Sequence, residues 1–316
     1  MTRSYQRILV TGARGFLGHH IVSALRKAGY TQIIEVGRKE YDLLEPGAAE
    51  QMIEDTTPDA VIHLAARVGG IIANRNYPAD FYYDNITINT QTFQAAYKAK
   101  VKKLLTFMGA CSYPATARTP IGEQQMWDGI PAFESAPYSL AKRMLLVQSE
   151  AYRRQHGFHS IVLIPGNVYG EQDNFNRDDA HVIPAMILRF IEARDNREPA
   201  VTCYGSGRPT RDFVYAGDVA GVVPWFLEHY DSSEPVNIST GTRTRIRELA
   251  EQTARTVGYR GEIRWDTRMP DGHMDKILDV SRLKELGLSC NTPLEEGLRK
   301  TVTWYEQART EGTVRL

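Results

Sequence analysis

The 316-residue chain has few cysteines, no excess of either charge and no long apolar run. Cys111, Cys203 and Cys290 are far apart and odd in number, which argues against a disulfide framework or a zinc site and predicts free thiols with no metal. Lys and Arg together number 38, as do Asp and Glu, so neither nucleic acid nor a membrane surface is indicated as a partner. No apolar stretch reaches the roughly 18 residues that span a bilayer. A strand and a glycine turn fill the first dozen residues and leave no space for a signal peptide, so we expect a soluble, cytoplasmic protein.

Short apolar segments alternate with helical patterns through the first half of the chain. Strands are expected at 7–10, 32–36, 60–65, 103–108 and 160–165, and helices at 18–28, 48–55, 81–98 and in a segment ending near 156. Strands separated by helices predict right-handed crossovers, and hence an α/β fold with a doubly wound parallel sheet of the Rossmann type.

The alternation loosens after residue 169. Residues 170–179 are polar and indicate a loop, 212–215 and 236–239 look like strands returning to the sheet, and 244–256 and 294–308 look like helices. We therefore expect a dinucleotide-binding domain over 1–170, with returning segments near 212–240. A smaller C-terminal substrate-binding lobe would be formed by 171–211 and 241–316.

A glycine-rich turn follows the first strand, with Gly12, Gly15 and Gly18 spaced three apart. A turn of this kind lets the backbone approach a pyrophosphate at the N-terminus of the next helix. Such a spacing also arises by chance, but the strand before it and the helix after it favour a dinucleotide site.

Two arginines bear on the choice of cofactor. Arg14 lies inside the glycine turn, and Arg38 follows the second strand, where an NAD site usually has a carboxylate for the ribose 2′-hydroxyl. Guanidinium groups suit the 2′-phosphate, so NADP(H) is favoured over NAD(H). The alternative is a pair of solvated surface arginines.

Tyr138 and Lys142 form the strongest catalytic pattern, Tyr-x-x-x-Lys. The spacing puts both side chains on one helical face, where the ammonium is expected to lower the pKa of the phenol. The phenol could then exchange a proton with a substrate hydroxyl or carbonyl. The pattern is weak alone, but with the glycine turn it predicts redox chemistry on a nicotinamide.

Other candidates lie where strands end. Ala65 and Ala66 form a turn of small residues that would allow close approach of a cofactor, whereas His63 before them is more often structural. Cys111 follows the fourth strand, at the end of a parallel sheet where ligands bind, although a lone cysteine is commonly inert. His181 opens a helix after the polar loop, and packing and proton transfer are equally plausible roles for it.

Together these residues resemble the GDP-L-fucose synthase family of the extended short-chain dehydrogenase/reductases. The matching phrases are Ala65-Ala66-Arg67-Val68-Gly69-Gly70-Ile71, Tyr77-Pro78-Ala79-Asp80-Phe81, Cys111 with Tyr113-Pro114, Asp173-Asn174-Phe175, His181-Val182-Ile183-Pro184, Gly205-Ser206-Gly207 and Pro270-Asp271-Gly272 with Lys276. The resemblance spans nearly the whole chain, and it implies a nucleotide-diphosphate sugar as substrate, with GDP as the expected nucleotide.

By this resemblance, Tyr138 would protonate the C4 oxygen of a 4-keto-deoxy sugar, and Lys142 would hold the cofactor ribose. Cys111 and His181 would be the base and acid of epimerisation at C3 and C5. The remaining residues implied are Pro165 and Asn167 beside the nicotinamide, Arg14 and Arg38 at the 2′-phosphate, and Asn174, Arg189, Tyr204, Arg211 and Asp271 at the sugar nucleotide. The helix at 81–98 and the Tyr-x-x-x-Lys helix would form a homodimer interface.

The chain also departs from the family. Gly109 stands where the family has a serine that binds the C4 oxygen, His273-Met274-Asp275 replaces Thr-Pro-Arg, and 174–180 is unusually acidic. Two alternatives therefore stay open. One is a nucleotide-sugar epimerase or dehydratase with a tightly held NAD(P) and no net reduction, and the other is a non-catalytic cofactor-binding protein.

Overall fold

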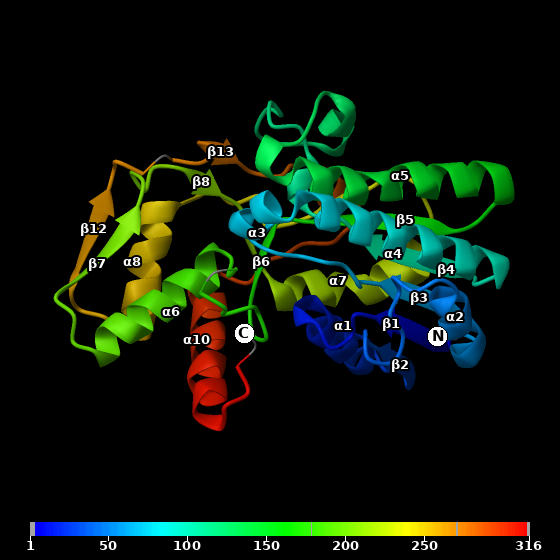
Figure 1. Ribbon diagram of the computed structural model, residues 1–316, viewed down its shortest axis with the longest axis horizontal. Helices are drawn as coiled ribbons and strands as arrows, with labels where there is room; N and C mark the ends of the chain where they lie inside the picture. The colour runs from blue at the N-terminus through cyan, green and yellow to red at the C-terminus, as the bar shows by residue number, and fades with distance from the viewer. Residues whose placement is uncertain (1–3, 178, 270, 315–316) are drawn as a thin grey trace.

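Six strands form one parallel sheet at the centre of the larger part of the molecule (Figure 1). The computed structural model describes residues 4–177, 179–269 and 271–314. The sheet order is β10-β5-β4-β3-β1-β2. The strands are β1 (Arg7–Thr11), β2 (Gln32–Val36), β3 (Ala60–His63), β4 (Lys103–Phe107), β5 (Ser160–Pro165) and β10 (Val236–Ile238). The order reverses between β1 and β3, so a crevice for ligands is expected at the carboxyl ends of these strands. The predicted doubly wound sheet is confirmed.

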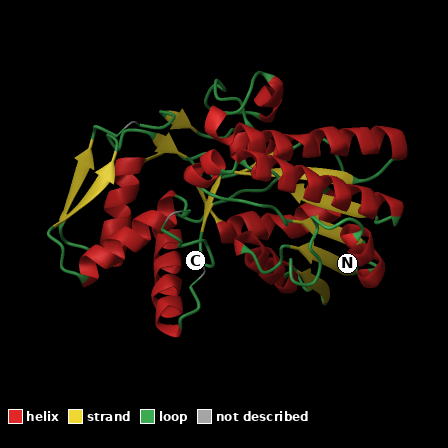
Figure 2. Ribbon diagram, viewed as in Figure 1, coloured by secondary structure: helices red, strands yellow, loops and turns green. Residues whose placement is uncertain are grey.

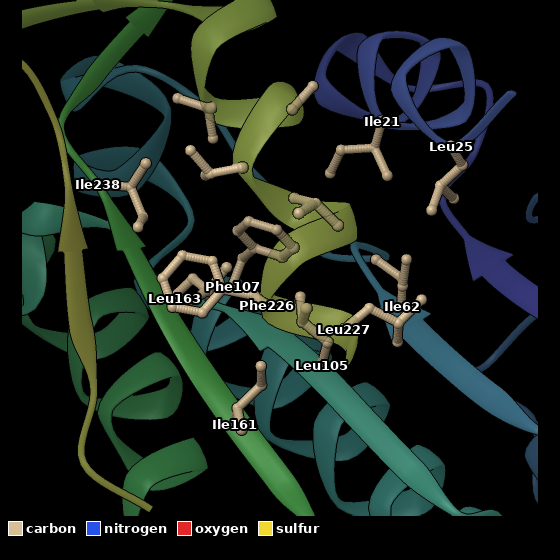
Figure 3. Close-up of a cluster of buried hydrophobic side chains, with 14 of the residues drawn as sticks. Ile21, Leu25, Ile62, Leu105, Phe107, Ile161, Leu163, Phe226, Leu227 and Ile238 are labelled. Carbon is tan, nitrogen blue, oxygen red and sulfur yellow. The ribbon is translucent and has the colours of Figure 1, made fainter. Parts of the chain in front are cut away.

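Helices cover both faces of this sheet because successive strand residues point to opposite sides. Ile8 and Val10 pack toward α1 (Phe16–Lys27) and α7 (Ala216–His229), as Figure 3 shows for other members of the same core. Leu9 points the other way, into a second core. That second core is covered by α2 (Ala48–Thr56), α4 (Pro78–Lys98) and α5 (Ala136–His156).

A smaller group of elements, which we call the lobe, packs around a third core beside the sheet (Figures 1 and 2). Its main elements are α6 (Val182–Asp195), β7 (Ala200–Tyr204), α8 (Ile246–Val257), β12 (Glu262–Asp266) and α10 (Leu294–Glu311). Strands β7 and β12 pair in parallel. The short strands β8 (Thr210–Arg211), β11 (Thr244–Arg245) and β13 (Asp275–Lys276) form a separate sheet.

The remaining elements are shorter. They are α3 (Ile71–Asn76), β6 (Asn167–Tyr169), β9 (Phe213–Tyr215), α9 (Ser281–Glu285) and 3-10 turns at Ala110–Ser112, Glu123–Trp127 and Phe133–Ser135. Val280, Leu283 and Cys290 join the core under α1 and α7, so the chain returns to the large sheet between β13 and α10. Within the described ranges, no helix combines the length and the apolar character needed to cross a membrane.

Candidate active site

The glycine turn after β1 has the geometry that a dinucleotide site needs. Gly12 has a φ of +67°, and a Cβ there would lie 2.9 Å from the backbone nitrogen of Ala65. A Cβ on Gly18 would lie 2.3 Å from the Gly12 carbonyl oxygen. Gly15 is the N-cap of α1 and has no side chain to cap the first turn. The amides that begin α1 can therefore face a pyrophosphate.

The two predicted cofactor arginines each face a carboxylate. Arg14 Nη1 lies 2.6 Å from Glu40 Oε1, and the Gly37 amide donates to Glu40 Oε2 at 2.9 Å. These contacts hold the pKa of Glu40 below its usual value. Arg38 pairs with Asp42 at 2.9 Å. Glu40 was missed by the sequence reasoning, although it follows the same β2 tip.

Tyr138 and Lys142 lie on the first turns of α5, and the Phe81 ring packs edge-on against Tyr138 with 6.1 Å between centroids. Lys142 is buried, and burial lowers its pKa to about 8, while the Cys111 thiol opposes this shift. Burial raises the pKa of Tyr138, and the Cys111 thiol raises it further. The expected lowering of the phenol pKa is wrong in this structure because desolvation dominates. Tyr138 therefore stays protonated at neutral pH.

Cys111 lies in the 3-10 turn after β4, close enough to influence three titratable side chains electrostatically. These are Tyr138, Lys142 and Lys276, so the thiol belongs to the same group of side chains as the tyrosine–lysine pair. A Cβ at Gly109 would lie 3.2 Å from Cys111 Sγ, so the absence of a side chain at 109 gives the thiol its space.

Buried Arg143 holds this turn in place. Its Nε donates to the Ser112 carbonyl oxygen at 3.1 Å, and its Nη1 donates to the Gly129 carbonyl oxygen at 2.9 Å. The guanidinium also lies 5.4 Å from the centroid of the Trp127 ring. The sequence reasoning did not single out Arg143, although it directly follows Lys142.

His181 is the N-cap residue of α6 and keeps an exposed side chain. The surrounding protein nevertheless lowers the pKa of its imidazole, and the Asp179 carboxylate opposes this effect. His181 lies in the lobe, on α6, whereas Cys111 and Tyr138 lie in the part of the molecule that contains the large sheet.

In the lobe, Arg189 and Tyr204 lie together. The Arg189 guanidinium carbon is 5.2 Å from the centroid of the Tyr204 ring, and Nη1 donates to the Thr202 carbonyl oxygen at 3.0 Å. Such a cation–π pair offers a flat, charged surface to a nucleotide.

Arg211 is the register partner of Lys276, since β8 and β13 run in parallel. Burial lowers the pKa of both residues. The Asp275 carboxylate opposes this shift at Arg211, whereas the Arg211 guanidinium lowers the pKa of Lys276 further. Two adjacent, half-buried cations fit a diphosphate. Lys276 belonged to a matching phrase but was not predicted as a site residue.

Three other predicted site residues already have protein partners. Asp271 accepts hydrogen bonds from the Ser206 amide at 2.8 Å and the Ser206 hydroxyl at 2.6 Å. Asn174 Oδ1 accepts from the Asn176 amide at 3.0 Å. The Asn167 side chain donates to the Asp212 carbonyl oxygen at 2.9 Å. Asp271 therefore shapes the turn after β7, while Pro270 of the same phrase lies outside the described residues.

The turn after β3 is built around His63. Its Nδ1 lies 2.8 Å from the Thr11 hydroxyl, and burial lowers its pKa to about 3, so it is neutral. The same hydroxyl accepts a hydrogen bond from the Ala65 amide at 3.2 Å, which holds Ala65 and Ala66 over the glycine turn. Pro165 ends β5, where it pairs with Ile238. In the described part of the chain, no group of three or more His, Cys, Asp or Glu side chains could hold a metal ion.

Comparison with known proteins defines the class. Residues 8–239 match the NAD dependent epimerase/dehydratase family. The chain is 38% identical over 300 residues to probable GDP-L-fucose synthase 1 of Oryza sativa subsp. japonica, covering 95% of this chain and 92% of that protein. It is 37% identical over 311 residues to GDP-L-fucose synthase of Escherichia coli (strain K12), covering 96% and 97%. A GDP-L-fucose synthetase from Naegleria fowleri bound to NADP superposes with a TM-score of 0.91 at 29% identity, covering 98% and 95%.

The doubly wound sheet and these relatives define the class as nucleotide-sugar epimerase/reductases with a Rossmann fold. The chain belongs to the NAD dependent epimerase/dehydratase family and, within it, to the GDP-L-fucose synthase family.

Proposed function

We propose that the protein is an NADPH-dependent epimerase/reductase that acts on a GDP-linked 4-keto-6-deoxy sugar. The observation that carries the proposal is the position of the Cys111 thiol, close enough to act on both Tyr138 and Lys142 at the carboxyl end of the sheet. Identity to GDP-L-fucose synthases over nearly the whole chain supports the substrate class.

The chemistry follows from the acidity of carbons beside a ketone. A 4-keto group acidifies C3 and C5, so Cys111 and His181 can remove a proton from one face and return a proton to the other. Tyr138 stays protonated and can donate its phenolic proton to the C4 oxygen during reduction. Lys142 would hold the cofactor ribose and orient Tyr138.

The cofactor proposed is NADPH, which supplies the hydride to C4 when bound. Gly12, Gly15 and Gly18 fit its pyrophosphate, because the turn has no room for a Cβ at Gly12 or Gly18. Arg14 and Arg38 would bind the 2′-phosphate after leaving their carboxylate partners, Glu40 and Asp42. The solved relative bound to NADP supports this choice.

The sugar nucleotide would lie against the lobe. Arg211 and Lys276 would bind the diphosphate, and Arg189 with Tyr204 would pack on the nucleotide. Asn174 and Asp271 would complete the pocket by shaping the loops around it.

Gly109 favours a second candidate, an epimerase that performs little or no net reduction. A hydroxyl at this position is a donor to the C4 oxygen in the family pattern, and loss of one such donor typically costs about 10²–10³-fold in rate. The protein would then retain epimerisation through Cys111 and His181.

One experiment decides between these candidates. The purified protein is given GDP-4-keto-6-deoxymannose in deuterated water, with NADPH or NADH, while absorbance at the nicotinamide band and deuterium at C3 and C5 are followed. Exchange with NADPH oxidation supports the epimerase/reductase, and exchange without oxidation supports the second candidate. The absence of both deuterium exchange and NADPH oxidation would contradict both candidates.

The variants Gly109→Ser and Gly109→Ala sharpen this test. Both add a Cβ that crowds Cys111 Sγ, but only serine adds a donor. If the protein is a reductase, Gly109→Ser should raise reduction at least roughly tenfold over Gly109→Ala, and both variants should slow exchange. Equal reduction rates in the two variants would show that the hydroxyl is not needed.

We also propose a cytoplasmic homodimer. Helices α4 and α5 pack on each other on one face of the sheet (Figure 1), and their outer surfaces expose Tyr82, Tyr83 and Val147. Light scattering of the wild type and of Val147→Glu tests this interface, since a charge in a helical interface should yield monomers. A reducing compartment suits the three free thiols.

A further inference from the structure

One hydrogen bond joins the two parts of the molecule beside the candidate site. The Gly70 amide, just before α3 on the sheet side, donates to Asp179 Oδ1 in the loop before α6 at 2.6 Å. A Cβ on Gly69 would lie 3.0 Å from the same oxygen, and a Cβ on Gly70 would lie 3.3 Å from the Asp179 carbonyl oxygen. The glycine pair is therefore packed directly against Asp179.

Asp179 lies two residues before His181, in a loop held by backbone hydrogen bonds. The amides of Asp179 and Ala180 both donate to the Asn176 carbonyl oxygen, at 3.2 and 2.8 Å. His181 follows at once as the N-cap of α6. A shift of Asp179 away from Gly70 would therefore move the imidazole as well.

The charge of Asp179 also acts on His181. The Asp179 carboxylate raises the pKa of the imidazole, against the lowering effect of the surrounding protein. The nearest cations in sequence are engaged elsewhere, since Arg177 pairs with Glu192 and Arg189 lies over Tyr204. Asp178 lies outside the described residues.

We propose that Asp179 is a positioning residue, which holds His181 at the candidate site by accepting the Gly70 hydrogen bond and places a negative charge beside the imidazole. The inference rests on the proposed function for the role of His181.

Four variants separate the contact from the charge. Asp179→Asn keeps an acceptor oxygen and removes the charge, whereas Asp179→Ala removes both. Gly70→Pro removes the donor at a φ of −65°, which proline adopts. Gly70→Ala is its matched control, because it adds a similar Cβ and keeps the amide proton.

Two measurements are made on the full-length protein. The first is the pH titration of the His181 ring by NMR of histidine-labelled protein, with the signal assigned by His181→Gln. The second is the pH profile of deuterium exchange at C3 and C5. Thermal unfolding of each variant shows whether it is folded.

Asp179→Asn should lower the pKa of His181 and move the alkaline limb of the exchange profile to lower pH, with the maximum rate largely retained. Asp179→Ala and Gly70→Pro should each slow exchange by roughly tenfold, about the value of one hydrogen bond that orients a reacting group, while Gly70→Ala slows it less. The double variant Asp179→Ala/Gly70→Pro should be no slower than Asp179→Ala alone.

An unchanged His181 titration in Asp179→Asn, or additive losses in the double variant, would overturn the proposal. If the wild type shows no exchange, the proposed function fails. The NMR titration then still decides whether Asp179 acts on His181, so the two failures are distinguishable.

Discussion

The sheet and the lobe hold their candidate site residues by different means. On the sheet, the cofactor turn is fixed by backbone geometry, since Gly12 and Gly18 leave no space for a side chain. In the lobe, side-chain contacts fix the candidate residues: Asp271 accepts a hydrogen bond from Ser206, and Arg189 lies over the Tyr204 ring. Backbone constraints permit few substitutions, whereas side-chain contacts can be exchanged singly. Under the proposed function, a change of sugar should therefore alter the lobe and leave the glycine turn intact.

The largest effect on reduction is expected at Tyr138, on the sheet side of the molecule. Tyr138→Phe keeps the ring that packs on Phe81 but removes the proton donor, so reduction should fall by about 10²–10⁴-fold. NADPH binding should stay within several-fold, as measured by fluorescence titration. Reduction at the wild-type rate would show that another group protonates the C4 oxygen.

Gly18→Ala tests the backbone constraint directly. The added Cβ would overlap the Gly12 carbonyl oxygen, so the turn must move, at a cost of about 1–3 kcal/mol in the free energy of unfolding. NADPH affinity should fall as well. Gly221→Ala is the control, because its Cβ meets nothing within 4 Å on helix α7 and alanine should be neutral or stabilising there. Similar urea midpoints for both variants would contradict the constraint.

Asp271→Ala tests the side-chain arrangement of the lobe. Loss of both hydrogen bonds to Ser206 should loosen the turn after β7 and raise the KM for the sugar nucleotide roughly fivefold. The Kd for NADPH should not change, because the turn lies away from β1 and β2. Ser206→Ala, which removes only the hydroxyl bond, should have a smaller effect. A matching loss of NADPH affinity would break the distinction between the two parts.

Local patterns predicted the sheet and its motifs, because a glycine turn or a Tyr-x-x-x-Lys spacing is contained in a few neighbouring residues. Helix α7 was missed because it is apolar over much of its surface and contains Pro224, which hides the helical period. The pairing of Lys276 with Arg211 depends on two short strands far apart in sequence. The raised pKa of Tyr138 depends on burial by the whole fold, which spacing alone does not reveal.

The smallest effect is expected at Glu40, because here a side-chain ion pair with Arg14, and not the backbone, fixes a residue of the proposed cofactor site. Glu40→Gln should release Arg14 and remove a negative charge beside the proposed 2′-phosphate, so NADPH should bind about two- to fivefold tighter while NADH changes little. Asp42→Asn is a parallel test, since it should release Arg38 in the same way. Salt should reduce the gain, because both ion pairs are exposed. An equal gain for NADH would place Glu40 away from the 2′-phosphate, and weaker NADPH binding would show that Glu40 orients Arg14 rather than competing for it.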